Sequence, residues 1–284
     1  MPILGSHTSI AGGYYKAIEI AHRCGCDCLQ VFTKNSNQWR AKPILEDEAV
    51  KFRSTLSALT IGHPIAHNSY LINLASPDEV LWRRSIEAFV VEIQRAELLG
   101  LAYVVTHPGA CVDSGEKQGL RRVVSALNKI HRQTRGVQVR ILLETTAGQG
   151  SCLGHRFEQL AAVLDGVKQP ERLGVCVDTC HIFAAGYPLH TLRQYRATMK
   201  QLAALVGLER VKAFHLNDSK RELGSRVDRH EHIGRGKLGL EPFRHLLNDE
   251  RFQQVPMYLE TPKGIVDGEE LDVLNLRTLR GLVE

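Results

Sequence analysis

Residues 173–178 read LGVCVD, an almost continuous apolar run that ends on a carboxylate and is followed by Thr-Cys-His at 179–181. A run this short and this apolar is typical of a strand that is buried on both faces. Seven other stretches have the same character: 3–5, 28–33, 61–67, 102–107, 140–144, 211–216 and 256–260. The sequence therefore predicts eight strands of a parallel sheet.

The segments between these runs have helical spacing. In the clearest, Ser76 is expected to cap a helix with Glu79 completing a capping box, Pro77 suits the first position, and Gly100 is placed to end it. Two others are 117–131 and 157–164. Strand and helix thus alternate eight times, and 284 residues suit a closed barrel, which typically needs about 250. We expect an α/β fold, a (β/α)8 TIM barrel in a single domain over 1–284, with an open doubly wound sheet as the alternative.

Composition sets the class of protein. No apolar run approaches the roughly 18 residues of a membrane span, and the N-terminus lacks the features of a signal peptide. Seven scattered cysteines indicate a reduced, cytoplasmic protein, and those at 24, 26 and 28 are expected to be small buried hydrophobes rather than a soft-metal site. The net charge of +5 permits an anionic partner without implying one.

Ionisable side chains stand where the predicted strands end. Parallel strands of a barrel point their carboxyl ends at one rim, which is where barrel active sites lie. Six consecutive strands ending in such groups would bring unpaired charges together, and cations would relieve that cost. Including the first turn after the sixth strand and the loop after the seventh, the candidates are five imidazoles and four carboxylates: His67, His107, Glu144, Asp178, His181, His215, Asp228, His230 and Glu260.

The donor types indicate the metal. Mixed imidazole and carboxylate ligands favour zinc, with manganese or iron as substitutes. Nine ligands at three to four per ion imply two or three ions, and Glu144, in the middle of the set, could bridge two of them. A core of this size does not need metals for stability, so we expect them to serve chemistry. Paired metals suit hydrolysis of a phosphodiester.

Two rim segments have compositions that suit nucleic acid. Residues 32–40 mix amides, basic residues and an indole, a set that suits backbone contacts and stacking. Residues 68–74 expose Tyr70 and Leu71, which form either a wedge that enters a base stack or a loop anchored by apolar packing. His7 and His232 also lie near the rim and are expected to orient ligands. The glycines of 148–154 miss the dinucleotide-binding spacing by one residue, so this segment is expected to be a loop with tight turns.

Several of these motifs together resemble the endonuclease IV family, the zinc-dependent apurinic/apyrimidinic endonucleases of DNA base-excision repair. The match runs over essentially the whole chain. The motifs that carry it are FTKN at 32–35, SYLINL at 69–74, HPG at 107–109, ETTAGQG at 144–150, DTCH at 178–181, HLND at 215–218 and DRH at 228–230.

The resemblance implies three zinc ions per chain. The first would be held by His67, His107 and Glu144, the second by Glu144, Asp178, His215 and Glu260, and the third by His181, Asp228 and His230. It also implies a deoxyribonuclease IV activity, with Glu144, Asp178 and Glu260 as catalytic residues. The phosphodiester 5′ to an abasic site would be hydrolysed, leaving a 3′-hydroxyl and a 5′-deoxyribose phosphate, and blocked 3′ ends would be trimmed.

The same resemblance implies a double-stranded DNA partner that contains abasic sites, a monomeric enzyme with no membrane partner, and a cytoplasmic location associated with the nucleoid through DNA. The DNA-binding residues it implies are Asn35, Asn37, Gln38, Tyr70, Leu71 and Arg229. At position 37 the family usually has Arg, so the side chain here is shorter and uncharged.

Two rival functions remain. A metal-dependent sugar isomerase on a similar barrel would use mostly carboxylates and a catalytic Lys, whereas here imidazoles dominate and no Lys stands at a strand end beside the ligands. A non-enzymatic DNA-binding module would not need nine metal ligands.

Overall fold

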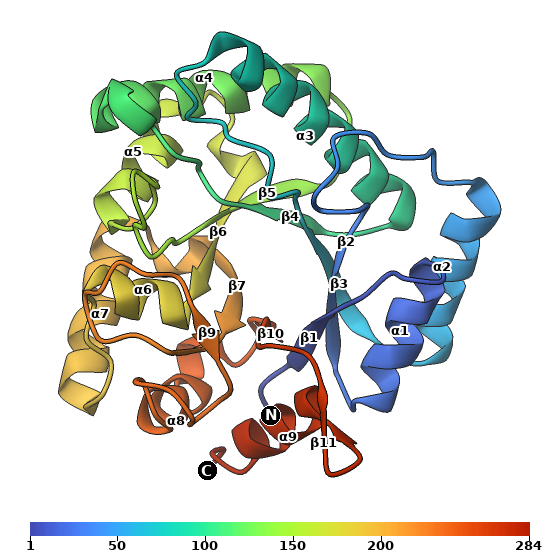
Figure 1. Ribbon diagram of the computed structural model, residues 1–284, viewed down its shortest axis with the longest axis vertical. Coiled ribbons are helices and arrows are strands. Elements are labelled where there is room, and N and C mark those ends of the chain that lie inside the picture. The colour runs from blue at the N-terminus through green and yellow to red at the C-terminus, as the bar shows by residue number, and fades with distance from the viewer.

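The computed structural model describes all of residues 1–284, and its eight long parallel strands close into one barrel. Figure 1 shows this barrel with the helices outside it and the two chain ends on the same side. Each barrel strand pairs in parallel with both neighbours, so the predicted TIM barrel is confirmed. Its strands are β1 (Leu4–Thr8), β2 (Cys28–Phe32), β3 (Gly62–His67), β4 (Tyr103–Thr106), β5 (Arg140–Glu144), β6 (Leu173–Asp178), β7 (Val211–Leu216) and β10 (Met257–Leu259).

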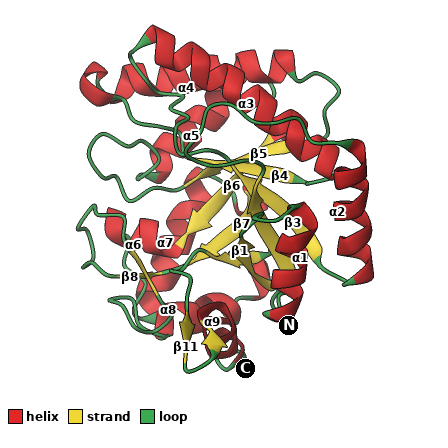
Figure 2. Ribbon diagram, turned by 45° about the vertical axis from the view of Figure 1, so that its right-hand side comes forward, coloured by secondary structure: helices red, strands yellow, loops and turns green.

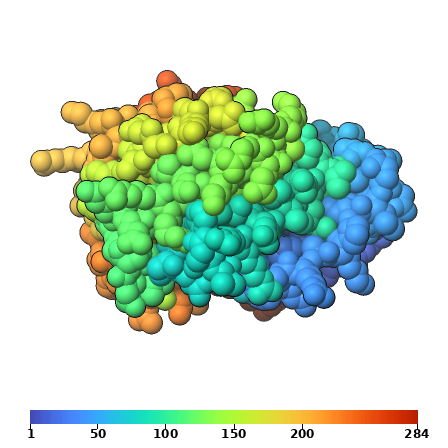
Figure 3. All heavy atoms as spheres, turned by 90° about the horizontal axis from the view of Figure 1, so that it is seen from above, coloured from blue at the N-terminus to red at the C-terminus, as the bar shows by residue number.

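Helices cover the outside of the barrel, as Figure 2 shows with the helices in red around the yellow strands. They are α1 (Tyr14–Arg23), α2 (Glu46–Ala58), α3 (Glu79–Leu99), α4 (Glu116–Gln133), α5 (Phe157–Gly166), α6 (Thr179–Ala185), α7 (Leu192–Leu205), α8 (Glu241–Leu247) and α9 (Leu271–Arg280). Successive parts of the chain follow one another around the surface, from blue through green to orange in Figure 3. No helix has the length and apolar character needed to cross a membrane.

Short strands and single helical turns lie in the connecting loops. Two antiparallel pairs lie outside the barrel: β8 (Asp218–Ser219) with β9 (His230–Glu231), and β11 (Ile265–Val266) with β12 (Glu269–Glu270). Four single turns of 3-10 helix are η1 (Val112–Ser114), η2 (Pro170–Arg172), η3 (Leu208–Arg210) and η4 (Glu250–Phe252). The excursion between β8 and β9 matters most, because it returns residues 228–230 to the mouth of the barrel.

The start of α3 corrects one sequence prediction. The helix begins at Glu79, and its N-cap is Asp78 rather than Ser76. The Asp78 carboxylate accepts hydrogen bonds from the backbone N–H groups of Val80 (2.8 Å) and Leu81 (2.9 Å). Asp caps as well as Ser does, and its negative charge is also favoured by the helix dipole. The predicted end is right, because Gly100 adopts the left-handed conformation (φ 73°) that terminates the helix.

The barrel interior is layered. Side chains two residues apart on a strand point to the same face, so each strand offers the interior a short column of alternate residues. The lower layer is an apolar cluster of Cys28, Ile65, Val105, Leu142, Cys176, Ala213 and Tyr258. Two residues further along each of these seven strands stands a polar side chain. This apolar layer therefore forms a dry floor beneath a polar ring.

The cysteines behave as small buried residues. Cys24, Cys26 and Cys28 are all buried, and all seven cysteines of the chain are free thiols. The 148–154 loop also matches its prediction, because Gly148, Gly150 and Gly154 all adopt positive φ in tight turns.

Buried His131, near the end of α4, is expected to make the stability of the fold sensitive to acid. Its side chain is buried, and neither ring nitrogen has a hydrogen-bond partner. Burial, aided by the charge of Arg172, lowers its pKa to about 4. As the pH falls, His131 is therefore protonated in the unfolded chain before it is protonated in the folded chain. The contribution of neutral His131 to the free energy of unfolding is complete above the ordinary pKa of 6.5 and is lost as the pH falls toward 4.

We expect the substitution His131→Leu to remove this sensitivity. At about pH 5 the wild type should have lost about 2 kcal/mol relative to pH 7 through His131, and the variant should not. Urea unfolding of both proteins at these two pH values measures the difference. An identical pH dependence in the two proteins would contradict the assignment.

Candidate metal centre

A ring of eight inward-pointing side chains lies directly above the apolar floor, at the carboxyl ends of the strands. Each is the upper residue of its strand's interior column or stands just beyond it. Six of the eight are predicted ligands, and the other two are a histidine and a glutamine. The ring consists of His7, Gln30, His67, His107, Glu144, Asp178, His215 and Glu260.

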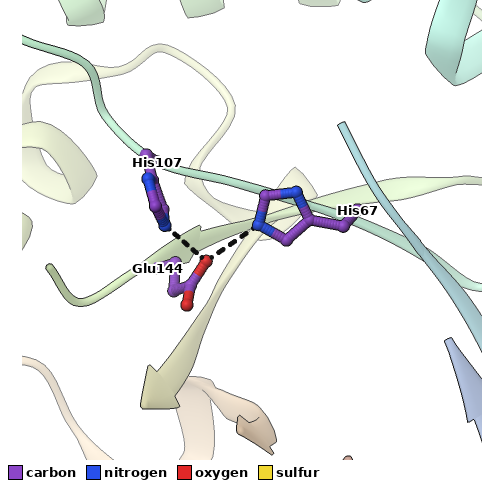
Figure 4. A group of neighbouring side chains, drawn as sticks. All are labelled: His67, His107 and Glu144. Atoms are coloured by element: carbon purple, nitrogen blue, oxygen red, sulfur yellow. Dashed lines mark hydrogen bonds and ion pairs between the residues drawn. The ribbon is translucent and has the colours of Figure 1, made fainter. Parts of the chain in front are cut away.

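The first group of ligand atoms joins β3, β4 and β5. The Nε2 atoms of His67 and His107 both lie 3.0 Å from Oε2 of Glu144. Figure 4 shows the two imidazoles pointing from different strands at this same carboxylate oxygen. The three donor atoms lie within 4.8 Å of one another, close enough to share one ion. The structure therefore brings together the predicted first set.

The second group uses the other oxygen of the same carboxylate. Nδ1 of His215 lies 2.9 Å from Oε1 of Glu144 and 3.2 Å from Oε2 of Glu260. Asp178 completes the group, with Oδ2 3.9 Å from Nδ1 of His215. Because Oε2 of Glu144 faces the first group and Oε1 the second, this fully buried carboxylate stands in a bridging position.

The third predicted set joins a helix to the β8–β9 excursion and is only partly reproduced as one group. The ligand atoms of His181 and His230 lie within 4.8 Å of one another together with Asp178, whereas Asp228 and His230 form a group with Cys180. His181 lies in the first turn of α6, where its backbone N–H donates to the capping carboxylate of Asp178 (2.7 Å). Its Nε2 lies 3.1 Å from Oδ2 of Asp228, and Nε2 of His230 lies 3.3 Å from Oδ1 of the same carboxylate. Cys180 is also within reach of this group, but burial raises the pKa of its thiol to about 12. A thiol that stays protonated is a poor ligand.

Four of the five imidazoles have one ring nitrogen within hydrogen-bond distance of a carbonyl oxygen, as metal-ligating imidazoles usually do. In metal sites, a ligating imidazole usually donates its second N–H to a carbonyl or carboxylate. The partners found here are all carbonyl oxygens: Nδ1 of His67 to Asn68 (2.8 Å), Nδ1 of His181 to Thr145 (2.8 Å), Nδ1 of His230 to Glu260 (3.2 Å), and Nε2 of His215 to the Gln30 amide (2.9 Å). In each case the other ring nitrogen points at one or more of the carboxylates.

The spacing of the donor atoms also fits metal ions. Ligands about 2.0 to 2.1 Å from a tetrahedral zinc lie about 3.3 Å apart. The closest nitrogen-to-oxygen distances in the three groups run from 2.9 to 3.3 Å. Moreover, the buried Nε2 atoms of His181 and His230 make no hydrogen bond, although Asp228 is within 3.3 Å of both. The residues therefore fit divalent ions.

The charges of the ring support the same conclusion. Burial alone would raise the pKa of Glu144, but the neighbouring His107 and His215 hold it well below its usual range. Burial likewise opposes ionisation of Asp228, and His181 outweighs it, so its pKa is also lowered. These carboxylates consequently remain ionised at neutral pH and are available as ligands.

Sequence reasoning missed two amides that hold the ligands in place. Gln30 accepts from Nε2 of His215, and its Nε2 donates to Oε1 of Glu260 (2.5 Å). Asn217 donates to Oδ2 of Asp178 (2.6 Å) and accepts from the backbone N–H of Glu260 (3.0 Å). A signal for Gln30 was present, because it stands two residues after the inward-facing Cys28, as each ligand stands above its own apolar residue. Its side chain is a neutral amide within a strand, whereas the metal-site prediction rests on ionisable groups at strand ends.

The two outlying histidines occupy different places. His7 is part of the ring, and its Nδ1 lies 3.3 Å from Oε1 of Glu260. His232 instead contacts the side-chain amide of Asn275 in α9 (3.1 Å). Only His7 therefore touches a predicted ligand.

An open cavity of about 720 Å³ lies above the ring, and two of the six predicted DNA-binding residues line it. Asn35 and Tyr70 line it together with Lys34, His230 and Glu260. Tyr70 is 64% exposed although it stands over the barrel mouth, whereas Leu71 is half-buried. The remaining three, which are exposed but do not line this cavity, are Asn37, Gln38 and Arg229.

Fold and site together define a TIM barrel whose mouth carries adjoining groups of His, Asp and Glu side chains that could hold metal ions. Residues 18–280 match a family model described as a xylose isomerase-like TIM barrel. A probable endonuclease 4 of Geobacter sulfurreducens is 53% identical over 99% of this chain and 94% of its own length. A second, from Chloroflexus aurantiacus, is 50% identical over 100% of this chain and 99% of its own.

A solved structure agrees with these relatives. The crystal structure of endonuclease IV from Thermus thermophilus is 37% identical and covers 99% of this chain and 98% of its own, with a TM-score of 0.86. The chain belongs to the endonuclease IV family.

Proposed function

We propose that this protein is a DNA-repair endonuclease that hydrolyses the phosphodiester 5′ to an abasic site in duplex DNA. The products are a 3′-hydroxyl and a 5′-deoxyribose phosphate. The observation that carries the proposal is the bridging position of Glu144, whose two oxygens face two ligand groups while a third group adjoins them. Such an arrangement suits in-line displacement at phosphorus, where charge on both the attacking and the leaving oxygen must be stabilised.

The ions are three zincs, with manganese or iron as substitutes. His67, His107 and Glu144 would hold the first, and His181, Asp228 and His230 the third; the second would be held by Glu144, Asp178, His215 and Glu260. When bound, such ions activate water at neutral pH and neutralise charge on phosphate oxygens. We propose Glu144, Asp178 and Glu260 as the catalytic carboxylates, because all three belong to the second group.

The chain's own residues supply orientation and exclude water. Gln30 and Asn217 fix the carboxylates of Glu260 and Asp178, so the ring needs little rearrangement during the reaction. Above it, Tyr70 and Leu71 form the wedge that fills the gap left by a displaced abasic sugar. An ordinary tyrosine has a pKa of about 10, so the wedge is uncharged at neutral pH.

The remaining DNA contacts come from exposed polar side chains at the rim. These are Asn35, Asn37, Gln38 and Arg229. The shorter Asn37 leaves Tyr70 and Leu71 as the main wedge. We further propose that the same site trims blocked 3′ ends, and that residues 1–284 act as one domain, as a monomer in the cytoplasm, bound to the nucleoid through DNA.

The isomerase alternative is disfavoured by the position of one lysine. Lys263, three residues after Glu260, lines the cavity and is closer to the ligands than the sequence indicated. Its ammonium group, however, donates to the Asp272 carboxylate (2.7 Å) and to the Ser6 hydroxyl (2.7 Å). A charge-paired lysine is poorly placed for proton transfer to a sugar.

Metal content and nicking, measured on the same purified protein, test the proposal. We expect about three zinc ions per chain, since nine ligands at three to four per ion require that number when Glu144 is shared. We also expect incision of a duplex with a synthetic abasic site and no incision of the intact duplex. Equal activity on both duplexes, or none on either, would refute the proposed substrate.

A further inference from the structure

Two rim loops that carry the proposed DNA contacts are joined through one buried carboxylate on an outer helix. We define them as the 33–42 loop, which follows β2, and the 68–74 loop, which follows β3. We propose that Glu92 of α3 is a positioning residue that fixes these two loops relative to each other and so determines how tightly the protein binds damaged DNA. This inference rests on the proposed function.

Glu92 contacts both loops directly. One oxygen, Oε1, accepts a hydrogen bond from the backbone N–H of Ser69 (3.0 Å), in the 68–74 loop. The other, Oε2, accepts from the hydroxyl of Thr33 (3.2 Å), in the 33–42 loop. The carboxylate thus stands between two segments that follow neighbouring strands of the barrel.

A buried lysine completes the link. Nζ of Lys34 lies 3.3 Å from Oε1 of Glu92, and the two side chains are only 4% and 1% exposed. The same ammonium group donates to the backbone carbonyl of Gln38 (2.5 Å), which spans the turn of the 33–42 loop. The Ser69 hydroxyl donates to the carbonyl of Ser36, so the loops also touch each other.

A second anchor lies one turn further along α3. The guanidinium of Arg95 donates to the carbonyls of Thr33 (2.6 Å) and Lys42 (2.6 Å), at the two ends of the 33–42 loop. Neither loop contains a helix or strand, so these side chains replace the backbone pairing that would otherwise order it. An outer helix packed against the barrel therefore sets the shape of the mouth.

The contacts place the DNA-binding residues. Asn35 directly follows Lys34, and Tyr70 directly follows Ser69. Loss of the Glu92 charge would leave Lys34 buried without its ion pair, a change that is costly enough to shift the loop. The effect should fall on binding, since Glu92 touches no metal ligand.

Steady-state kinetics of Glu92→Gln on an abasic duplex test the proposal. We expect KM to rise about 10-fold with kcat changed less than about twofold, the pattern of lost uniform binding. Metal content should be unchanged. The fluorescence of 2-aminopurine placed opposite the abasic site should show reduced unstacking. Glu87→Gln, an exposed position on the same helix, is the matched control and should resemble the wild type.

The outcomes separate a positioning role from other roles. Glu92→Asp keeps the charge beside Lys34 and should fold even if Glu92→Gln does not, with KM raised because the shorter side chain cannot reach both loops. An unchanged KM and fluorescence in the Asp and Gln variants would overturn the proposal, as would an equal fall in kcat with loss of metal. If the wild type itself does not nick an abasic duplex, the proposed function fails instead.

Discussion

Replacing Glu144 by alanine is expected to abolish cleavage of an abasic duplex and to remove more than one metal ion per chain. Its two oxygens face different ligand groups, so a single substitution takes a donor from both. Even residues that only orient metal ligands are worth about 10- to 100-fold in activity, so loss of a shared ligand should cost more than about 100-fold. Single-turnover nicking and elemental analysis of the purified variant measure the two effects.

Asp228→Ala is the matched control, because Asp228 lies beside His181 and His230 and takes no part in the first or second group. It should lower the metal content by about one ion, since it belongs to one site, whereas Glu144→Ala should lower it by about two. Circular dichroism of both variants checks that the barrel is intact. Full activity in folded Glu144→Ala, or the same metal loss in both variants, would refute the bridging role.

The ring was predictable because a barrel converts strand order into proximity. An apolar run that ends on His or a carboxylate places that group at the rim, whatever the distance in sequence, and this holds for His67, Glu144 and Asp178 alike. The helical cap role of Asp178 and its role as a ligand also proved compatible, because Oδ1 caps α6 while Oδ2 faces His215. The sequence pattern therefore identified side chains whose position follows from strand register.

The residues that the sequence did not predict depend on contacts between segments that are distant in the chain. Gln30 is neutral and stands within its strand rather than at its end, so only the closed ring shows that it joins His215 to Glu260. Glu92 is a charged residue in the middle of a helix, where a charge normally faces solvent. Its burial is explained by its hydrogen bonds to the two loops and by its ion pair with Lys34. Helical periodicity carries no information about such partners.

The substitution Glu260→Gln should separate cleavage from binding. Oε1 of Glu260 is an acceptor for Gln30, whereas Oε2 faces Nδ1 of His215. A glutamine would keep its amide oxygen toward Gln30 and turn its NH2 toward His215, which replaces a ligand atom by a donor that cannot bind metal. Cleavage should fall more than about 100-fold, because loss of a residue that only orients a metal ligand already costs about 10- to 100-fold, and loss of the ligand itself should cost more.

Affinity for the abasic duplex should change less than about threefold in this variant, because DNA is held mainly by contacts at the rim and the second group keeps Glu144, Asp178 and His215. Fluorescence anisotropy gives Kd, and single-turnover nicking gives the rate. Glu250→Gln, an exposed position outside the cavity, should match the wild type in both. If binding and cleavage were lost in parallel, Glu260 would contribute to DNA binding. Retained cleavage would exclude it from the metal centre.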